Sequence, residues 1–274
     1  MRYLLGALAG YEKDEAIAVA DMPELERYIL HRLYETGEAV RRGYETFDFK
    51  RAYWALLNFM TVDLSAFYFD IRKDALYCDP LSSVRRRACR TLMDLLFHSL
   101  TAWLAPILCF TMEEAWQSRF GRGSVHLERF PDVDASWRDE ALSAKWDKVR
   151  EVRRVVTGAL EIERQVKKTI GSSLEAAPVV HVSDAELLAA LDGVDFAEIS
   201  ITSDVKVVGG EGPADAFRLD EVAGVAVVPE RARGRKCARS WKISEDVGAD
   251  PDFPDITARD AKAVREWQEA EGRA

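Results

Sequence analysis

The chain has 274 residues, of which 48% are hydrophobic, and its formal net charge is −9. This length and composition exclude a disordered chain and predict one or two domains with a buried core. The acidic balance excludes polyanion binding through net charge, so a nucleic-acid partner would have to be held by local patches of Lys and Arg.

Cysteine usage and hydropathy favour a reduced, cytoplasmic protein without a membrane anchor. The cysteines, which show no spacing typical of a disulfide framework or a metal site, are Cys78, Cys89, Cys109 and Cys237. The longest apolar stretch, residues 92–110, is interrupted by polar residues and by Pro106, so it does not provide the roughly 20 apolar residues that cross a bilayer. Residues 1–10 contain only one basic residue, and we expect the tail of a helix there rather than a signal peptide.

Helical periodicity begins at about residue 21. Asp21, Pro23 and Glu24 form a capped entry to a first helix that runs to about Gly43. Asp48 can cap a second helix, in which apolar residues recur at three- and four-residue spacing and predict one broad core-facing stripe. The stripe comprises Phe49, Tyr53, Leu56, Leu57, Met60, Leu64, Phe67 and Tyr68.

The next two helices are separated by a proline. The apolar spacing over residues 92–108 predicts a third core helix, and Pro106 is expected to bend or end it because proline lacks a backbone donor and clashes with the preceding turn. Thr111 and Glu114 form a capping-box pattern that predicts the start of a short fourth helix. A loop is expected over residues 125–133.

A fifth helix, from about Asp139 to Lys168, completes the predicted helical part. Four or five helices with short connections favour an antiparallel bundle. The charged group Asp70, Arg72, Lys73 and Asp74 is interpreted as an intrahelical network on the second helix, worth about 0.2–0.5 kcal/mol per pair.

Beyond Gly171 the pattern becomes α+β. We predict strands over residues 178–182, 196–202, 205–208 and 222–228, and a short helix over residues 183–191. Ser183 and Glu186 are expected to form its capping box. A further helix is predicted near residues 258–271. The domain organisation is therefore a helical domain over 1–171, a small α+β module over 172–232 and a compact appendage over 233–274.

A basic segment opens the appendage. Residues 233–242 hold five positive charges and one indole without an acidic residue. Such a cluster suits a flexible single-stranded loop, because cations hold its phosphates while an unstacked base lies on the ring. The alternative is a solvated turn with Trp241 packed in the core. The candidate RNA contacts here are Arg235, Lys236, Arg239, Trp241 and Lys242.

Other basic groups lie on the predicted helices. Lys50 and Arg51 are the exposed candidates at the start of the second helix, and Arg86 belongs to an arginine-rich segment after Pro80. A further basic set decorates the fifth helix. Most such charges on amphipathic helices are solvated faces, so a track for phosphates is the less common interpretation. The four histidines, His31, His98, His126 and His181, show no metal spacing, and nothing in the sequence forms an active site.

Three segments stand out along the chain: residues 64–77 (LSAFYFDIRKDALY), residues 168–176 (KTIGSSLEA) and residues 237–241 (CARSW). Taken together and in this order, they resemble the C-terminal part of isoleucyl-tRNA synthetases. The turn over residues 104–116 resembles valyl and leucyl relatives as well, so it marks only the broader class. No motif resembles the HIGH-type or KMSKS-type catalytic signatures of the family.

The resemblance covers almost the whole chain and implies a helical anticodon-binding domain. The implied partners are the tRNA for isoleucine and the catalytic and editing domains of the same protein, which these residues do not contain. The family's reaction uses ATP and Mg²⁺, both handled by residues outside this sequence. No membrane partner is expected, and the protein is expected to be a monomer.

The last segment resembles a knuckle that in many of these synthetases holds zinc through two Cys-x-x-Cys pairs. Here Cys237 is kept, but Ser240, Thr257 and Asp260 stand at the other ligand positions. Structural zinc needs four Cys or His ligands, so one thiolate is not enough and we expect no metal. Apolar packing is predicted to replace it, by Trp241, Ile243, Phe253, Ile256, Val264 and Trp267.

Two alternatives remain open from the sequence. One is the corresponding region of a valyl or another related class I synthetase. The other is a noncatalytic helical scaffold that binds protein through its broad apolar faces. Salt dependence separates RNA binding from protein binding, because phosphate contacts release counterions and weaken steeply as salt rises.

Overall fold

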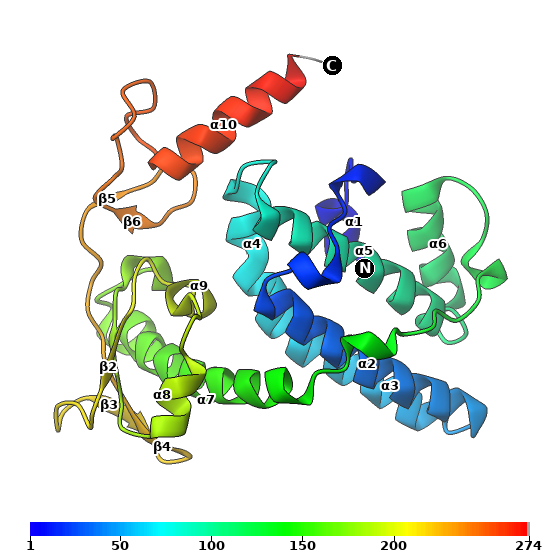
Figure 1. Cartoon of the computed structure of the whole chain (residues 1–274), viewed down its shortest axis with the longest axis horizontal. Coiled ribbons are helices and arrows are strands. Elements are labelled where there is room, and N and C mark those ends of the chain that lie inside the picture. Colours follow the sequence, from blue (N-terminus) through cyan, green and yellow to red (C-terminus); the bar gives the residue numbers. More distant parts are fainter. Residues whose placement is uncertain (273–274) are drawn as a thin grey trace. The chain divides into compact units, whose positions relative to one another are not determined.

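The computed structural model describes residues 1–272 and divides them into two compact units, with the boundary between Glu140 and Ala141 (Figure 1). Helices form most of the regular structure, and the strands all lie in the second unit, which confirms a mainly α fold with a small α+β module. Within residues 1–272, no helix combines the length and the apolar composition that a membrane-spanning helix requires. The domain boundaries predicted at 171/172 and 232/233 remain predictions.

The first unit is a helical bundle centred on α5. Its helices are α1 (Arg2–Ala7), α2 (Glu24–Glu45), α3 (Phe49–Asn58), α4 (Phe69–Cys78), α5 (Val84–Leu104) and α6 (Cys109–Phe120). A π-helical segment over Phe59–Tyr68 joins α3 to α4 without a break. Helix α5 contacts α1, α2, α4 and α6, so its apolar residues form the middle of the core.

Two predicted helix boundaries are confirmed. The side chain of Asp48 caps α3 by accepting a hydrogen bond from the backbone N–H of Arg51, at 3.0 Å. Helix α5 ends at Leu104, two residues before Pro106, as the missing donor of proline requires. Both boundaries could be predicted from the sequence because caps and prolines act on neighbouring residues.

One predicted cap and one predicted start are wrong. Helix α2 begins at Glu24, as the sequence predicts, but Asp21 lies in a short 3₁₀ turn and α2 has no side-chain cap. Helix α6 begins at Cys109, so Thr111 is already inside its first turn. The reason is that the preceding turn continues into the helix: the N–H of Leu108 bonds to Leu104 O at 2.8 Å, and the N–H of Met112 bonds to Leu108 O at 2.9 Å.

The outer part of the predicted apolar stripe on the second helix is exposed. Phe49 and Tyr53 are 51% and 44% exposed, whereas Ala52 is fully buried. A Cβ at Gly43 would lie only 3.0 Å from the Ala52 Cβ, so α2 and α3 approach closely at this point. This contact turns Ala52 toward α2 and leaves the two aromatic rings at the edge of the interface.

A buried ion pair joins α2 to α4. Arg72 donates from Nε and Nη2 to the two carboxylate oxygens of Glu26, at 2.6 and 2.7 Å, and the Tyr68 hydroxyl donates to the same carboxylate at 2.9 Å. Glu26 is 0% exposed and Arg72 is 2% exposed. Arg72 is therefore a core residue, although the predicted Asp70–Lys73 contact is present on the surface at 2.7 Å.

The second unit combines a long helix, a small sheet and a C-terminal knuckle (Figure 1). Its helices are α7 (Glu140–Ile162, starting at the unit boundary), α8 (Ala185–Ala190), α9 (Phe196–Ser200) and α10 (Ala258–Glu271). Its strands are β1 (Val179–Val182), β2 (Lys206–Gly209), β3 (Phe217–Leu219), β4 (Val222–Val228), β5 (Arg235–Lys236) and β6 (Ile243–Ser244). In the larger sheet the order is β2-β1-β4-β3, with β1 parallel to β2 and antiparallel to β4.

One predicted strand is wrong, and one predicted cap is shifted. Residues 196–200 form α9, because Asp195 accepts the N–H of Glu198 at 3.0 Å and caps a helical turn that buries Phe196 and Ile199. The alternation of apolar residues in this short run fits both structures. Helix α8 is capped by Asp184 rather than by Ser183, at 2.8 Å to the N–H of Glu186.

The knuckle consists of the β5–β6 hairpin and α10. Gly234 enters it at a φ of +113°, and a Cβ there would lie 2.3 Å from the carbonyl carbon of Ser244. Only glycine fits this close approach. Cys237, Val247, Ile256 and Ala261 form the buried apolar cluster of the knuckle.

The buried ion pair between Glu26 and Arg72 leads to a prediction about stability. Glu26→Leu leaves the Arg72 guanidinium buried without its countercharge, so we expect a loss of about 3–5 kcal/mol in the free energy of unfolding. The double variant Glu26→Leu/Arg72→Met should lose much less. Urea denaturation followed by circular dichroism measures both, with Asp70→Ala as a surface control. Equal losses for Glu26→Leu and Asp70→Ala would contradict a structural role for the pair.

Candidate nucleic-acid interface

The indole of Trp241 is at the surface of the knuckle. Trp241 is 63% exposed, so the alternative in which its ring packs in the core is wrong. Its N–H bonds to the carbonyl of Cys237 at 3.0 Å, and the N–H of Cys237 bonds to the carbonyl of Lys242 at 2.8 Å. These bonds close a tight turn between β5 and β6 that presents the ring.

The backbone of Trp241 is in the left-handed region, with a φ of 65°. A non-glycine residue there costs on the order of 1 kcal/mol and persists only where the surroundings require it. Strain of this kind gathers at ligand-binding positions, which makes Trp241 the leading candidate of the interface.

The predicted cations of the basic segment divide into two groups. Lys236 is exposed and Lys242 is half-buried, both close to Trp241 in sequence. Arg235 donates to the carbonyls of Val247 and Pro254, at 3.3 and 3.0 Å, and thus supports the loop before α10. Arg239 donates to Asp260 at 3.3 Å. Their roles in RNA binding remain predictions, and both arginines also brace the knuckle.

The four positions that the resemblance assigns to zinc ligands come together around Asp260. The Asp260 Oδ2 atom accepts hydrogen bonds from Cys237 Sγ, Ser240 Oγ and Thr257 Oγ1, at 3.1, 2.9 and 2.6 Å. Cys237 and Asp260 are both 0% exposed. We call these four residues the Asp260 cluster.

The donor set of the Asp260 cluster does not fit zinc. It offers one thiol, one carboxylate and two hydroxyls, whereas structural zinc is held by four Cys or His ligands. The thiol and both hydroxyls already donate their protons to one carboxylate oxygen. Hydrogen bonds therefore make the connections among these positions that a metal ion would otherwise make.

The charge of Asp260 is stabilised by its neighbours. Burial by itself raises the pKa of Asp260, but the hydrogen bond from Thr257, the charge of Arg259 and the hydrogen bonds from Cys237 and Ser240 together hold that pKa below its usual value. The hydrogen bonds and the nearby charge therefore stabilise the ionised carboxylate of Asp260 over its protonated form.

The predicted apolar packing is only partly present. Phe253 and Val264 pack against the buried cluster that contains Ile256. Trp241 and Trp267 are 63% and 38% exposed, so these two rings do not fill the space of a metal. The hydrogen bonds of the Asp260 cluster connect these positions together with the apolar contacts, and the sequence did not predict them.

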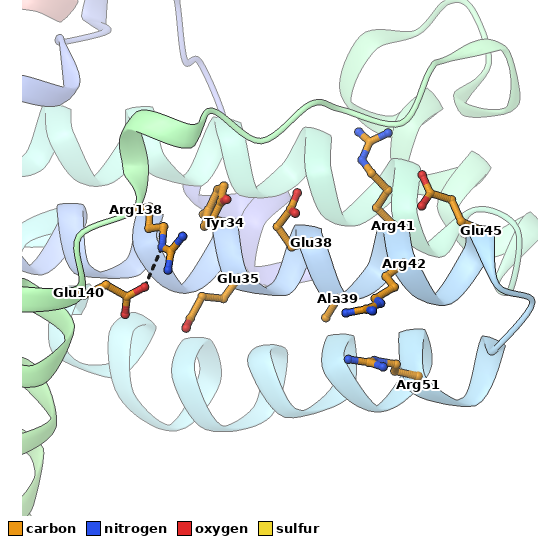
Figure 2. Close-up of a pocket in the computed structure, with 10 residues that line it drawn as sticks. All are labelled: Tyr34, Glu35, Glu38, Ala39, Arg41, Arg42, Glu45, Arg51, Arg138 and Glu140. Atoms are coloured by element: carbon orange, nitrogen blue, oxygen red, sulfur yellow. Dashed lines mark hydrogen bonds and ion pairs between the residues drawn. The ribbon is translucent and has the colours of Figure 1, made fainter.

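Lys50 and Arg51 lie on a second charged surface, at the start of α3, and both are exposed. Beside them lies a pocket of about 600 Å³ whose lining is drawn in Figure 2. The lining residues are Tyr34, Glu35, Glu38, Ala39, Arg41, Arg42, Glu45, Arg51, Arg138 and Glu140. Arg42 was not among the contacts predicted from the sequence, because charges such as the adjacent Arg41 and Arg42 on an amphipathic helix are usually a solvated face.

Arg86 is the predicted contact that the structure does not support. It is 4% exposed, and its Nη1 atom lies 3.7 Å from a carboxylate oxygen of Glu15. Burial, together with the charge of Arg90, lowers the pKa of Arg86 against the opposing effect of Glu15. The side chain belongs to the interior of the first unit, where a nucleic acid does not reach it.

Within residues 1–272, His31, Glu35 and Glu140 form a group that has the residue types and spacing of a metal site, with ligand atoms within 4.8 Å of one another. However, Nδ1 of His31 accepts the N–H of Asp139 at 2.9 Å, which places the ring proton on Nε2. A metal ion would need the lone pair of that nitrogen, so this cluster is not a suitable cation site. It joins α2 to the segment before α7 instead.

Comparison with known proteins shows which family the chain resembles. Residues 26–180 match the family described as the anticodon-binding domain of tRNA ligase. The chain is 60% identical over 267 residues to the isoleucine–tRNA ligase of Agrobacterium fabrum, covering 97% of this chain and 27% of the relative. The corresponding ligase of Brucella abortus biovar 1 is 60% identical over 269 residues, and that of Bartonella henselae is 52% identical over 269 residues, each covering 98% of this chain and 28% of the relative. The chain thus spans just over a quarter of the length of these curated relatives.

The Asp260 cluster makes a metal prediction. We expect purified protein to contain no stoichiometric zinc and its melting temperature to be unchanged by a chelator. The triple variant Ser240→Cys/Thr257→Cys/Asp260→Cys should bind one zinc ion per chain, because the four side chains already converge. Elemental analysis measures both. Stoichiometric zinc in the unaltered protein would refute the assignment.

The Asp260 cluster also makes a pH prediction. An aspartate whose folded pKa lies below its unfolded value of about 3.9 stabilises the fold fully above about pH 5, and this contribution is lost as pH falls through the folded pKa. The hydrogen bond from Arg265 likewise lowers the pKa of Asp250, so protonation of Asp250 also reduces the stability of the fold at acid pH. We therefore expect the stability difference between wild type and Asp260→Asn to be largest above pH 5 and to shrink toward pH 3. Thermal unfolding across this range measures it, and a difference that does not change with pH would contradict the prediction.

Proposed function

The chain belongs to the family of anticodon-binding domains of tRNA ligases, and from this premise we propose that it is the tRNA-binding C-terminal region of an isoleucine–tRNA ligase. In this proposal it recognises the anticodon region of the tRNA for isoleucine. The 60% identity to isoleucine–tRNA ligases over 97% of the chain favours this ligase over a valyl or another related one.

One observation carries the proposal: the exposed Trp241 ring is held by a strained turn beside Lys236 and Lys242. An unpaired base stacked on such a ring is worth roughly 1–3 kcal/mol, and neighbouring cations hold the phosphates on either side. Because the Asp260 cluster fixes the turn before RNA arrives, little conformational freedom is lost on binding.

The aminoacylation reaction belongs in this proposal to the rest of the protein. ATP, Mg²⁺ and isoleucine would be handled by a catalytic domain of the same protein, and an editing domain would be a further intramolecular partner. The region described here would hold the anticodon end of the tRNA, so that its acceptor end is positioned elsewhere. The working protein would be a cytoplasmic monomer.

The proposal predicts a coupled loss of binding. Trp241→Ala and an altered anticodon in the isoleucine tRNA should each weaken binding by about 5- to 150-fold, the range that corresponds to 1–3 kcal/mol. Their combined effect should be smaller than the product of the two, because both remove the same stacking contact. Filter binding or fluorescence anisotropy measures the four combinations. Independent, fully multiplicative losses would contradict a shared contact.

Two control variants separate binding from folding. Trp241→Gly suits the left-handed backbone better than tryptophan, so it should keep or raise the melting temperature while weakening tRNA binding. Trp267→Ala removes another exposed indole of the same unit, on α10, and should leave tRNA binding unchanged. A flat salt dependence of the wild-type interaction would favour the protein scaffold instead.

A further inference from the structure

The pocket beside α3 contains two arginines without carboxylate partners. Arg42 on α2 and Arg51 on α3 both line it, and Figure 2 shows their guanidinium groups extending into the same space between the two helices. Within residues 1–272, neither guanidinium forms an ion pair or a hydrogen bond with the protein. Both side chains are exposed, so a ligand can reach them.

The other arginines of the pocket are already neutralised. Arg41 pairs with Asp132 at 2.6 Å, and Arg138 pairs with Glu140 at 2.7 Å. Figure 2 shows Glu38 and Glu45 on the side of α2 where Arg41 lies, away from the space between α2 and α3. The lining holds four glutamates and four arginines, and among the described residues Arg42 and Arg51 are the lining arginines that no carboxylate pairs.

An anion between the two guanidinium groups relieves their mutual repulsion. A guanidinium presents parallel N–H donors that match two oxygens of a phosphate, and charge-assisted hydrogen bonds of this kind are about twice as strong as neutral ones. The helices hold the two arginines from opposite sides of the groove, because Gly43 and Ala52 bring α2 and α3 into close contact nearby. The geometry suits one phosphate gripped from two sides.

The surroundings favour the phosphate of a polymer. Lys50 precedes Arg51, and Trp54, which is 54% exposed, lies on the same face of α3 as Arg51 at a spacing of three residues. The surface beyond the two arginines therefore carries a further cation, Lys50, and an exposed indole, Trp54. This combination suits a nucleic-acid backbone that runs past the pocket.

We propose that Arg42 and Arg51 form a two-arginine clamp for a single phosphodiester of the bound tRNA, in addition to the contact at Trp241. This assignment rests on the proposed function. Arg51 was predicted from the sequence, together with Lys50, as a candidate RNA contact, and the structure adds Arg42 on α2 beside it.

The test is the salt dependence of tRNA binding by Arg42→Gln, Arg51→Gln and the double variant. Losing one phosphate contact lowers the slope of log affinity against log salt by about 0.7–0.9. We expect each single variant to show this change and to bind about 10-fold more weakly at low salt, since a hydrogen bond to a charged group is worth about that factor. The double variant should resemble the single ones, because all three lose the same phosphate.

The matched control is Arg41→Gln, which lines the same pocket but is paired with Asp132. It should keep both the slope and the affinity of the wild type. If Arg42→Gln and Arg51→Gln bind as Arg41→Gln does, the clamp is refuted while the proposed function stands. If the wild-type chain shows no salt-dependent tRNA binding at all, both fail.

Two further measurements complete the test. Inorganic phosphate titrated by calorimetry distinguishes a polymer site from a small-anion site: saturable binding of free phosphate at Arg42 and Arg51, with unchanged tRNA binding in the variants, would overturn the assignment to RNA. Thermal unfolding of each variant should match the wild type, because both side chains are exposed and make no contact that holds the fold.

Discussion

A carboxylate that leaves water must receive hydrogen bonds and positive charge, and each unit of this protein is organised around one such group. In the first unit, Glu26 receives two hydrogen bonds from Arg72 and one from Tyr68, which ties α2 to α4. Arg72 and Tyr68 belong to the segment LSAFYFDIRKDALY, so the most recognisable run of the sequence is a structural one. Its buried polar residues hold the core together.

In the second unit, Asp260 has the corresponding role. The hydrogen bonds from Cys237, Ser240 and Thr257 hold the hairpin against α10, and Arg239 adds a charge contact from the basic segment. The same hydrogen bonds that join the four positions of the Asp260 cluster therefore also fix the turn that exposes Trp241. The stability of the knuckle and the proposed recognition by Trp241 are linked here, because the strained backbone at residue 241 persists only while the knuckle around it is rigid.

Features that depend on neighbouring residues were predictable. The Asp48 cap, the end of α5 before Pro106 and the helix over Ala258–Glu271 are confirmed, since each follows from local backbone chemistry. The resemblance to isoleucyl-tRNA synthetases is confirmed as well. Short runs failed: residues 196–200 alternate in hydropathy like a strand but form a helix, because a run of five residues fits either period until Asp195 caps it.

The sequence by itself determined the helical class and the family, whereas the role of the basic segment with its tryptophan and the loss of a metal stay predictions. Tertiary structure alone decided which charges are buried and which are free to bind. Glu26 meets Arg72 across 46 residues and Cys237 meets Asp260 across 23, and Arg42 faces Arg51 only because two helices pack closely at Gly43. Burial and pairing of a charged side chain depend on residues far along the chain, so no local pattern reveals them.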